Sequence, residues 1–263
     1  MKGLIPFFVF ILISSWTSLV GQSNNTVIAH SHNDYEQERP LARALELGFQ
    51  SIEIDILLHE NQLKVSHNKS KLSQKPTIEE LYFDPLINLI KSDNLLKWVL
   101  IDFKHYSLET LETLHSSVLK YTDLFQSRTS NDRNSPLQII LSGNIPRKEI
   151  ANNPKYDYFF LDGRISDLDN TDPLIYTPII SSNITSFTTW RRNHNLKEDE
   201  MKTIKLLVNK LQVHGIKLRF WNTKDNVKIW TQLLDIGVDV ISVDNLEKFK
   251  EYTERINATI PQR

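Results

Sequence analysis

The chain contains no cysteine. Disulfide bonds, thiolate metal sites, a cysteine nucleophile and lipid attachment through cysteine are therefore excluded. An excess of charge is also lacking, because 31 basic and 32 acidic side chains leave a formal net charge of -1. No basic cluster with interleaved aromatic residues is present, so nucleic acid is not an expected partner.

Glycine is sparse, with 7 in 263 residues, and no glycine-rich loop follows the first predicted strand. That absence disfavours a dinucleotide-binding sheet. Apolar residues at 40% and charged residues at 24% are ordinary values for a globular protein. The chain shows no repeat, low-complexity segment or linker that would divide it beyond its N-terminal segment, so one large domain is expected.

The N-terminal segment differs in composition from the rest. Residues 1–21 place one lysine before an apolar run that gives way to small and polar residues. This pattern predicts a secretory signal peptide cleaved after Gly21, and a secreted or periplasmic mature domain of residues 22–263. A retained N-terminal membrane anchor is the alternative, although the apolar run is short for a full span.

Beyond that segment, apolar runs of strand length alternate with segments of helical spacing. The runs are rich in Ile, Val, Phe and Tyr, as buried strands are. The predicted strands are 26–30, 51–58, 97–103, 137–142, 156–161, 175–181, 216–221 and 238–243. The predicted helices are 40–47, 77–90, 107–120, 198–213 and 225–234.

Eight strands alternating with helices predict an α/β fold of the (β/α)8 TIM-barrel type. The connection over residues 161–175 is too short and polar for a full helix, so the barrel is expected to be irregular there. A doubly wound open sheet is the alternative fold.

Acidic residues mark the second and third predicted strands. Glu53 and Asp55 are two apart and share a face, and Asp102 lies in the next strand. Acids facing inward from an apolar strand are costly when ionised and unpaired. Three carboxylates suit one divalent cation, Mg²⁺ in preference to Ca²⁺. The alternative is a structural ion-pair network with basic side chains, namely Lys104, Arg164 and Arg219.

Two histidines accompany this carboxylate set. His30 ends the first predicted strand, and His67 follows a short extended piece soon after Asp55. In the absence of a serine or cysteine nucleophile motif, two histidines near a cation suit acid/base work on an oxygen ester. His32 stands two residues from His30 and either shares its face or only supports the turn.

Four stretches carry a resemblance to a known family. They read VIAHSHND, ALELGFQSIEIDILLHENQLKVSHN, VLIDFK and LRFWNTKDNVKIWTQLLDIGVDVISVDN. Together they resemble the phospholipase-C-like phosphodiesterase superfamily, which includes glycerophosphodiester phosphodiesterases and sphingomyelinase-D-like phospholipases. The most similar branch is that of the altered inheritance of mitochondria protein 6. The resemblance covers nearly all of the chain after the leader and implies a metal-dependent phosphodiesterase on a TIM barrel.

The resemblance also implies roles for individual positions. By position, His30 and His67 match the two catalytic histidines. The three acids match the metal ligands, namely Glu53, Asp55 and Asp102. Lys104 and Asn33 match substrate-contacting residues of the sphingomyelinase-D-like branch, and Trp221 matches a tryptophan often found near the substrate. Arg219 shares the strand face of Trp221, so it is expected to help shape the same pocket.

The chain departs from the glycerophosphodiester pattern at three places. It reads His30-Ser31-His32 where that group usually has His-Arg-Gly, and His67-Asn68 where it usually has His-Asp. Its third acid is aspartate rather than glutamate. These departures leave the head group open, although they spare the residues that the chemistry needs.

The expected function is therefore hydrolysis of a glycerophosphodiester or (lyso)phospholipid-type substrate, directly or through a cyclic phosphate. Small-molecule or lipid phosphodiesters are the expected partners, transient contact with a membrane surface is compatible with them, and no protein partner is predicted. Two alternatives stay open. One is a glycoside hydrolase that uses paired carboxylates, and the other is a catalytically inactive ligand-binding barrel.

Overall fold

The computed structural model describes residues 27–89, 96–129, 137–169, 176–189 and 195–259. The predicted signal peptide lies outside these residues. Within them, no helix combines the length and apolar character needed to cross a membrane.

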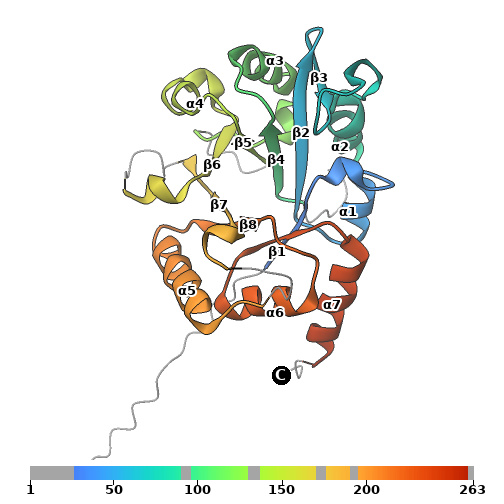
Figure 1. The fold of residues 1–263 in the computed structure, drawn as a ribbon. Helices are drawn as coiled ribbons and strands as arrows, with labels where there is room; N and C mark the ends of the chain where they lie inside the picture. The colour runs from blue at the N-terminus through green and yellow to red at the C-terminus, as the bar shows by residue number, and fades with distance from the viewer. Residues whose placement is uncertain (1–26, 90–95, 130–136, 170–175, 190–194, 260–263) are drawn as a thin grey trace, which may run out of the picture.

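A closed barrel of parallel strands forms the centre of the molecule, with helices around it (Figure 1). Within the described residues, neighbouring strands follow the order β1-β9-β8-β7-β6-β5-β4-β2, and pairing of β1 with β2 closes the ring. The barrel strands are β1 Ile28–Ser31, β2 Ser51–His59, β4 Trp98–Phe103, β5 Gln138–Gly143, β6 Phe159–Gly163, β7 Ile179–Asn183, β8 Lys217–Trp221 and β9 Val240–Val243. The predicted TIM barrel is confirmed.

One further strand, β3 Gln62–Val65, pairs with the end of β2 in an antiparallel hairpin. Glu60 and Asn61 at its turn both have positive φ, the conformation that two-residue hairpins favour. The hairpin extends β2 past the barrel (Figure 1). Its return strand brings His67 back to β2, where Ser66 donates its backbone N–H to the carbonyl of Asp55 at 3.1 Å.

The five predicted helical segments form helices whose ends shift by a few residues. The described helices are α1 Ala42–Glu46, α2 Asp84–Leu89 after a π-helical turn Glu79–Phe83, α3 Leu108–Val118, α4 Arg147–Asn152, α5 Glu198–Gln212, α6 Val227–Ile236 and α7 Leu246–Thr259. The sequence did not predict α4 and α7. After β6, the described part of the connection is a 3-10 turn, Ile165–Asp169, which fits the predicted irregularity.

The barrel interior changes from apolar to polar along its axis. A small cluster of buried apolar side chains fills its lower part, namely Ile28, Trp98, Ile140, Ile179 and Val240. Side chains two residues further along a strand point to the same face. In β1, β5 and β7 those next inward positions are His30, Ser142 and Ser181. The apolar floor therefore supports a polar layer at the carboxyl ends of the strands.

Candidate functional site

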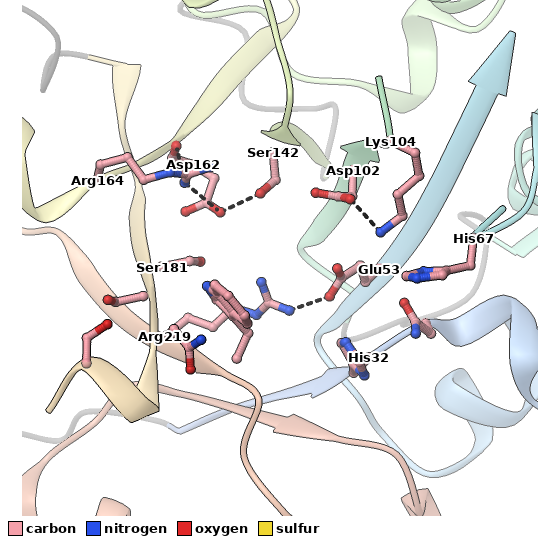
Figure 2. Close-up of a pocket in the computed structure, with 16 residues that line it drawn as sticks. His32, Glu53, His67, Asp102, Lys104, Ser142, Asp162, Arg164, Ser181 and Arg219 are labelled. Carbon is pink, nitrogen blue, oxygen red and sulfur yellow. Dashed lines mark hydrogen bonds and ion pairs between the residues drawn. The ribbon is translucent and has the colours of Figure 1, made fainter. Parts of the chain in front are cut away.

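A cavity of about 540 Å³ opens at the carboxyl ends of the strands (Figure 2). Most of the site residues predicted from the sequence line it, namely Asn33, Glu53, His67, Asp102, Lys104, Arg219 and Trp221. His30 and Asp55 do not line it and are fully buried. Trp221 is 43% exposed at its rim. The fold thus gathers residues of β2, β4 and β8, and of the segments that follow β1, β3 and β4, around one opening.

Three donors converge on one oxygen of Asp55. Its Oδ2 lies 2.7 Å from the Tyr35 hydroxyl, 2.8 Å from His67 Nδ1 and 2.7 Å from Lys104 Nζ. Because a carboxylate only accepts, His67 donates from Nδ1 and keeps Nε2 available on a side chain that is 59% exposed. Asp55 Oδ1 is buried and has no hydrogen-bond partner among the described residues.

Lys104 joins two of the predicted metal ligands. Its Nζ also lies 2.7 Å from Asp102 Oδ2, and Asp102 stands directly across from Asp55 in the β2–β4 register. Burial by itself lowers the pKa of Lys104, but the two carboxylates outweigh it and raise the pKa above its ordinary value. Burial raises the pKa of Asp102, and Lys104 only partly opposes that rise. The ammonium group therefore bridges both acids.

Gly143 allows the end of β5 to pass close to Asp102. Its φ is +75°, and a Cβ atom there would lie 2.5 Å from Asp102 Oδ1 and 2.6 Å from the carbonyl oxygen of Phe103. A larger residue would be strained and would displace the carboxylate. The sequence signal was a single Ser142-Gly143 pair after an apolar run, which by itself indicated only a strand end.

Glu53 is held by a different set of partners. It forms a buried ion pair with Arg219, and His30 Nε2 lies 3.0 Å from the same oxygen, Oε2. Arg219 Nε in turn donates to Ser242 Oγ at 3.1 Å. Burial alone raises the pKa of Glu53, but Arg219 and the hydrogen bond from His30 offset this and hold the pKa well below its usual range. Glu53 is therefore ionised and already neutralised by Arg219.

His30 lies beneath the cavity with both ring nitrogens engaged. Its Nδ1 is 2.7 Å from Ser51 Oγ, and its Nε2 faces Glu53. Burial, aided by the positive charge of Arg219, lowers the pKa of His30 to about 4. The neutral ring then donates from Nε2 to the carboxylate and accepts the Ser51 hydroxyl at Nδ1. In this arrangement His30 orients Glu53.

His32 lies on the cavity wall. Its backbone N–H donates to the Val243 carbonyl at 3.0 Å, and its Nδ1 is 2.7 Å from Asp244 Oδ1. Burial by itself lowers the pKa of His32, but the hydrogen bond to Asp244 outweighs it, so the pKa lies above its ordinary value. His32 therefore does more than support the turn after β1, because its side chain lines the cavity.

The opposite wall carries buried polar atoms without partners. Ser142 donates to Asp162 Oδ2 at 2.7 Å, and Arg164 lies 3.5 Å from that oxygen (Figure 2). Within the described residues, Asp162 Oδ1 and Ser181 Oγ are buried and make no hydrogen bond. Both residues line the cavity. Such atoms are rare in folded proteins unless water or a ligand satisfies them.

The predicted metal ligands fit a cation in their chemistry. Carboxylate oxygens are the donors that Mg²⁺ and Ca²⁺ prefer, and the unpaired Asp55 Oδ1 is one such donor. As the side chains lie, the described residues hold no group of three or more His, Cys, Asp or Glu arranged for a metal ion. Instead, Lys104 and Arg219 neutralise the acids. The alternative of an ion-pair network therefore describes the contacts present.

Comparison with known proteins bears on the family. Residues 20–99 match the model of the AIM6-like phosphodiesterase domain. An altered inheritance of mitochondria protein 6 homolog from Arthroderma benhamiae is 24% identical over 85% of this chain and 82% of its own length. The resemblance to the phospholipase-C-like phosphodiesterase superfamily is confirmed.

Solved structures of this superfamily share the fold. A glycerophosphodiester phosphodiesterase from Parabacteroides distasonis superposes with a TM-score of 0.54 at 19% identity, covering 88% of this chain and 98% of that one. An Oleispira antarctica phosphodiesterase, solved with its product sn-glycerol-3-phosphate, gives 0.52 at 12% identity over 87% and 97%. At sequence identities this low, the structural similarity shows a shared fold alone.

Sequence reasoning missed several residues of the candidate site. Tyr35, Ser181 and Asp244 each contact or line the site, and none was a predicted site residue. Asp244 had a signal, because it follows the last predicted strand. Tyr35 and Ser181 had none, since a tyrosine in a turn and a serine in a strand are common anywhere.

Proposed function

We propose that this chain is a metal-dependent phosphoric diester hydrolase that acts on a glycerophosphodiester or (lyso)phospholipid-type substrate. One observation carries the proposal. Glu53 and Asp102 line one cavity together with Lys104 and the exposed His67, and the buried Asp55 contacts Lys104 and His67 beneath it. That combination provides acids for a cation, a positive charge for phosphate and a proton-transfer group. The phosphodiesterase family match supports the same class.

The cation would be held by Glu53, Asp55 and Asp102, with Mg²⁺ preferred over Ca²⁺. When bound, it would supply Lewis-acid polarisation of the phosphoryl group. Support comes from the donor type and from the unpaired Asp55 Oδ1. Lys104 would leave this carboxylate pair to bind a phosphoryl oxygen, where its charge stabilises the charge that develops during reaction.

Proton transfer would involve His67 and a histidine from β1, for which the sequence indicates His30. His67 keeps Nε2 available because Asp55 holds Nδ1. Asp55 also fixes the tautomer, as an orienting carboxylate does in other acid/base sites. The attacking group is water, or a neighbouring substrate hydroxyl when a cyclic phosphate forms.

The organic part of the substrate would lie against the wall of Asp162, Ser181 and Trp221. The two unpaired oxygens there suit hydroxyl groups of the substrate, and the exposed indole offers an apolar face. The product complex of the Oleispira relative, with sn-glycerol-3-phosphate, is compatible with a polyol phosphate in such a cavity. A lipid substrate would also bring the cavity mouth to a membrane surface.

The proposed location is secreted or periplasmic. It rests on the composition of residues 1–21, which lie outside the described residues. Expression of the whole chain with a C-terminal tag tests it. Recovery outside the cytoplasm with a mass that starts after Gly21 supports cleavage, and an intact N-terminus in the membrane fraction supports the anchor.

Phosphorus NMR tests the proposed activity directly. The purified chain is mixed with glycerophosphodiesters, lysophospholipids and sphingophospholipids, each with Mg²⁺, with Ca²⁺ and with a chelator. A monoester or cyclic phosphate signal that disappears with chelator supports the proposal and shows which product forms. Absence of any product from the whole panel, together with a metal-independent cleavage of glycosides, would overturn it in favour of the sugar-cleaving alternative.

A further inference from the structure

His30, in β1, and His32, in the turn after it, lie at different depths below the cavity opening. His30 is 0% exposed, and Ser51 and Glu53 hold its two ring nitrogens. A group that transfers a proton to substrate must come within hydrogen-bond reach of the reacting oxygen. His30 has no free nitrogen for such a contact and no surface on the cavity.

His32 meets both conditions. It lines the cavity and its side chain is 32% exposed. The Nδ1 atom is held by Asp244, and Nε2 makes no hydrogen bond to another described residue. Figure 2 places His32 on the same side of the cavity as Glu53 and His67. An imidazole with one nitrogen held by a carboxylate and the other free is the arrangement of a proton-transfer histidine.

The carboxylate partner is itself held in place. Asp244 directly follows β9, and its backbone N–H donates to the Asp225 carboxylate at 3.1 Å. Its carbonyl accepts the side-chain amide of Gln37 at 3.0 Å. The backbone hydrogen bond from His32 to Val243 fixes the spacing between the two elements. His32 and Asp244 are therefore the first residues after β1 and β9, and the pairing of these two barrel strands holds them side by side.

We propose that His32, oriented by Asp244, is the general acid of the proposed phosphodiesterase, and that His30 only positions Glu53. This inference rests on the proposed function. Asp244 favours the imidazolium form, which His32 needs in order to act as an acid. Burial opposes that form by lowering the pKa of His32, and the hydrogen bond to Asp244 outweighs it.

The step balances with water as the only co-reactant. A water oxygen attacks phosphorus, and His67 takes one of its protons. The bond between phosphorus and the leaving oxygen breaks, and its electron pair stays on that oxygen. His32 Nε2 then donates a proton to it, so the products are an alcohol and a phosphomonoester. Proton exchange with solvent restores both histidines.

Dependence on the leaving group separates this role from a structural one. An alkoxide needs a proton as it leaves, whereas p-nitrophenolate does not. The test uses two esters with the same glycerophosphoryl half, glycerophosphoethanol and glycerophosphoryl p-nitrophenol, in the whole chain with Mg²⁺. His32→Gln should lower kcat for the ethyl ester by about 10²- to 10⁴-fold and change the aryl ester by less than about tenfold.

Two further variants complete the experiment. Asp244→Asn should also lower kcat more for the ethyl ester than for the aryl ester, but by a smaller factor. In the His32→Gln background it should cause no further loss of kcat. His30→Gln should lower the melting temperature and reduce kcat for both esters by equal factors. Circular dichroism of each variant separates loss of folding from loss of chemistry.

The outcomes separate the two proposals. Full ethyl-ester activity in His32→Gln, or a selective loss in His30→Gln, overturns the His32 assignment while the phosphodiesterase class stands. An equal loss of activity on both esters in His32→Gln also overturns the role of His32 as a general acid. Failure of the unaltered chain on both esters and on the whole phosphodiester panel overturns the proposed function itself.

Discussion

The two sides of the cavity differ in how their polar atoms are satisfied. On the β1–β4 side, each acid has a basic partner, with Lys104 between Asp55 and Asp102 and Arg219 on Glu53. On the β6–β7 side, Arg164 lies near one oxygen of Asp162, but Asp162 Oδ1 and Ser181 Oγ are buried and make no hydrogen bond to a described residue.

The two sides would therefore receive a ligand in different ways. Ion pairs on the first side lower the cost of burying charges while the site is empty of substrate. A cation or a phosphate must then compete with Lys104 for its partners. The two unpaired oxygens of the second side have no such competitor among the described residues, so a substrate hydroxyl gains a hydrogen bond there directly. The first side is therefore expected to govern catalysis, and the second to govern substrate preference.

Removal of His67 should give the largest effect. His67→Ala should lower kcat on the accepted phosphodiester by about 10²- to 10⁴-fold, because a positioned proton-transfer group is lost. Its side chain is 59% exposed, so the melting temperature should stay unchanged. Steady-state kinetics with a thermal melt checks both statements. His59→Ala, a partly exposed histidine away from the cavity, is the matched control. Equal activity of the two variants would contradict the assignment.

Substitution of the buried Glu53 should have the largest effect on stability. Glu53→Gln leaves Arg219 charged and buried without its partner, which should cost about 3–5 kcal/mol in the free energy of unfolding. Urea denaturation measures it. The double variant Glu53→Gln with Arg219→Gln should recover part of the loss, because the uncompensated charge is gone. A single variant within about 0.5 kcal/mol of the parent would show that the pair is not desolvated.

Metal binding should weaken when Asp55 is changed. Asp55→Asn should lower Mn²⁺ affinity, measured by calorimetry, by more than the roughly 10- to 100-fold that loss of an outer partner costs. Asp34→Asn is the matched control, since Asp34 is a buried aspartate that bonds Ser31 and Tyr82 away from the cavity. Identical titrations of the parent and Asp55→Asn would remove Asp55 from the ligand set.

The serine of the opposite wall should give the smallest effect. Ser181→Ala should raise KM for a polyol phosphodiester by about two- to tenfold, the value of one hydrogen bond, and leave kcat nearly unchanged. Stability should not fall, because the hydroxyl has no described partner to lose. Ser242→Ala, whose hydroxyl accepts from Arg219, should lower stability instead. An unchanged KM in Ser181→Ala would show that the substrate does not reach this wall.

Much of the architecture was predictable because its signals are local. The alternating strands and helices predicted the barrel, and the two-residue spacing placed Glu53 and Asp55 on one inward face, as the structure shows. Helix α7 was missed although its buried apolar positions, Leu246, Phe249 and Tyr252, have helical spacing. The π-helical turn before α2 was likewise beyond a simple periodicity.

By itself, the sequence determined the fold class, the strand ends that carry polar side chains and the inward face of each acid. Local spacing suffices for these, since it decides which way a side chain points. The tertiary structure alone decided which partners meet. Asp244 lies 212 residues from His32, and Arg219 lies 166 residues from Glu53.

Depth was also decided by the tertiary structure. His30 and His32 have the same spacing parity, yet one is fully buried and the other borders the cavity. Their depths depend on how β1 aligns with β2 and β9 across the closed ring, where His30 pairs with Ser51 and Ser242. Strand register is a property of the whole barrel, because every strand must match two neighbours, and so no single stretch of sequence fixes it.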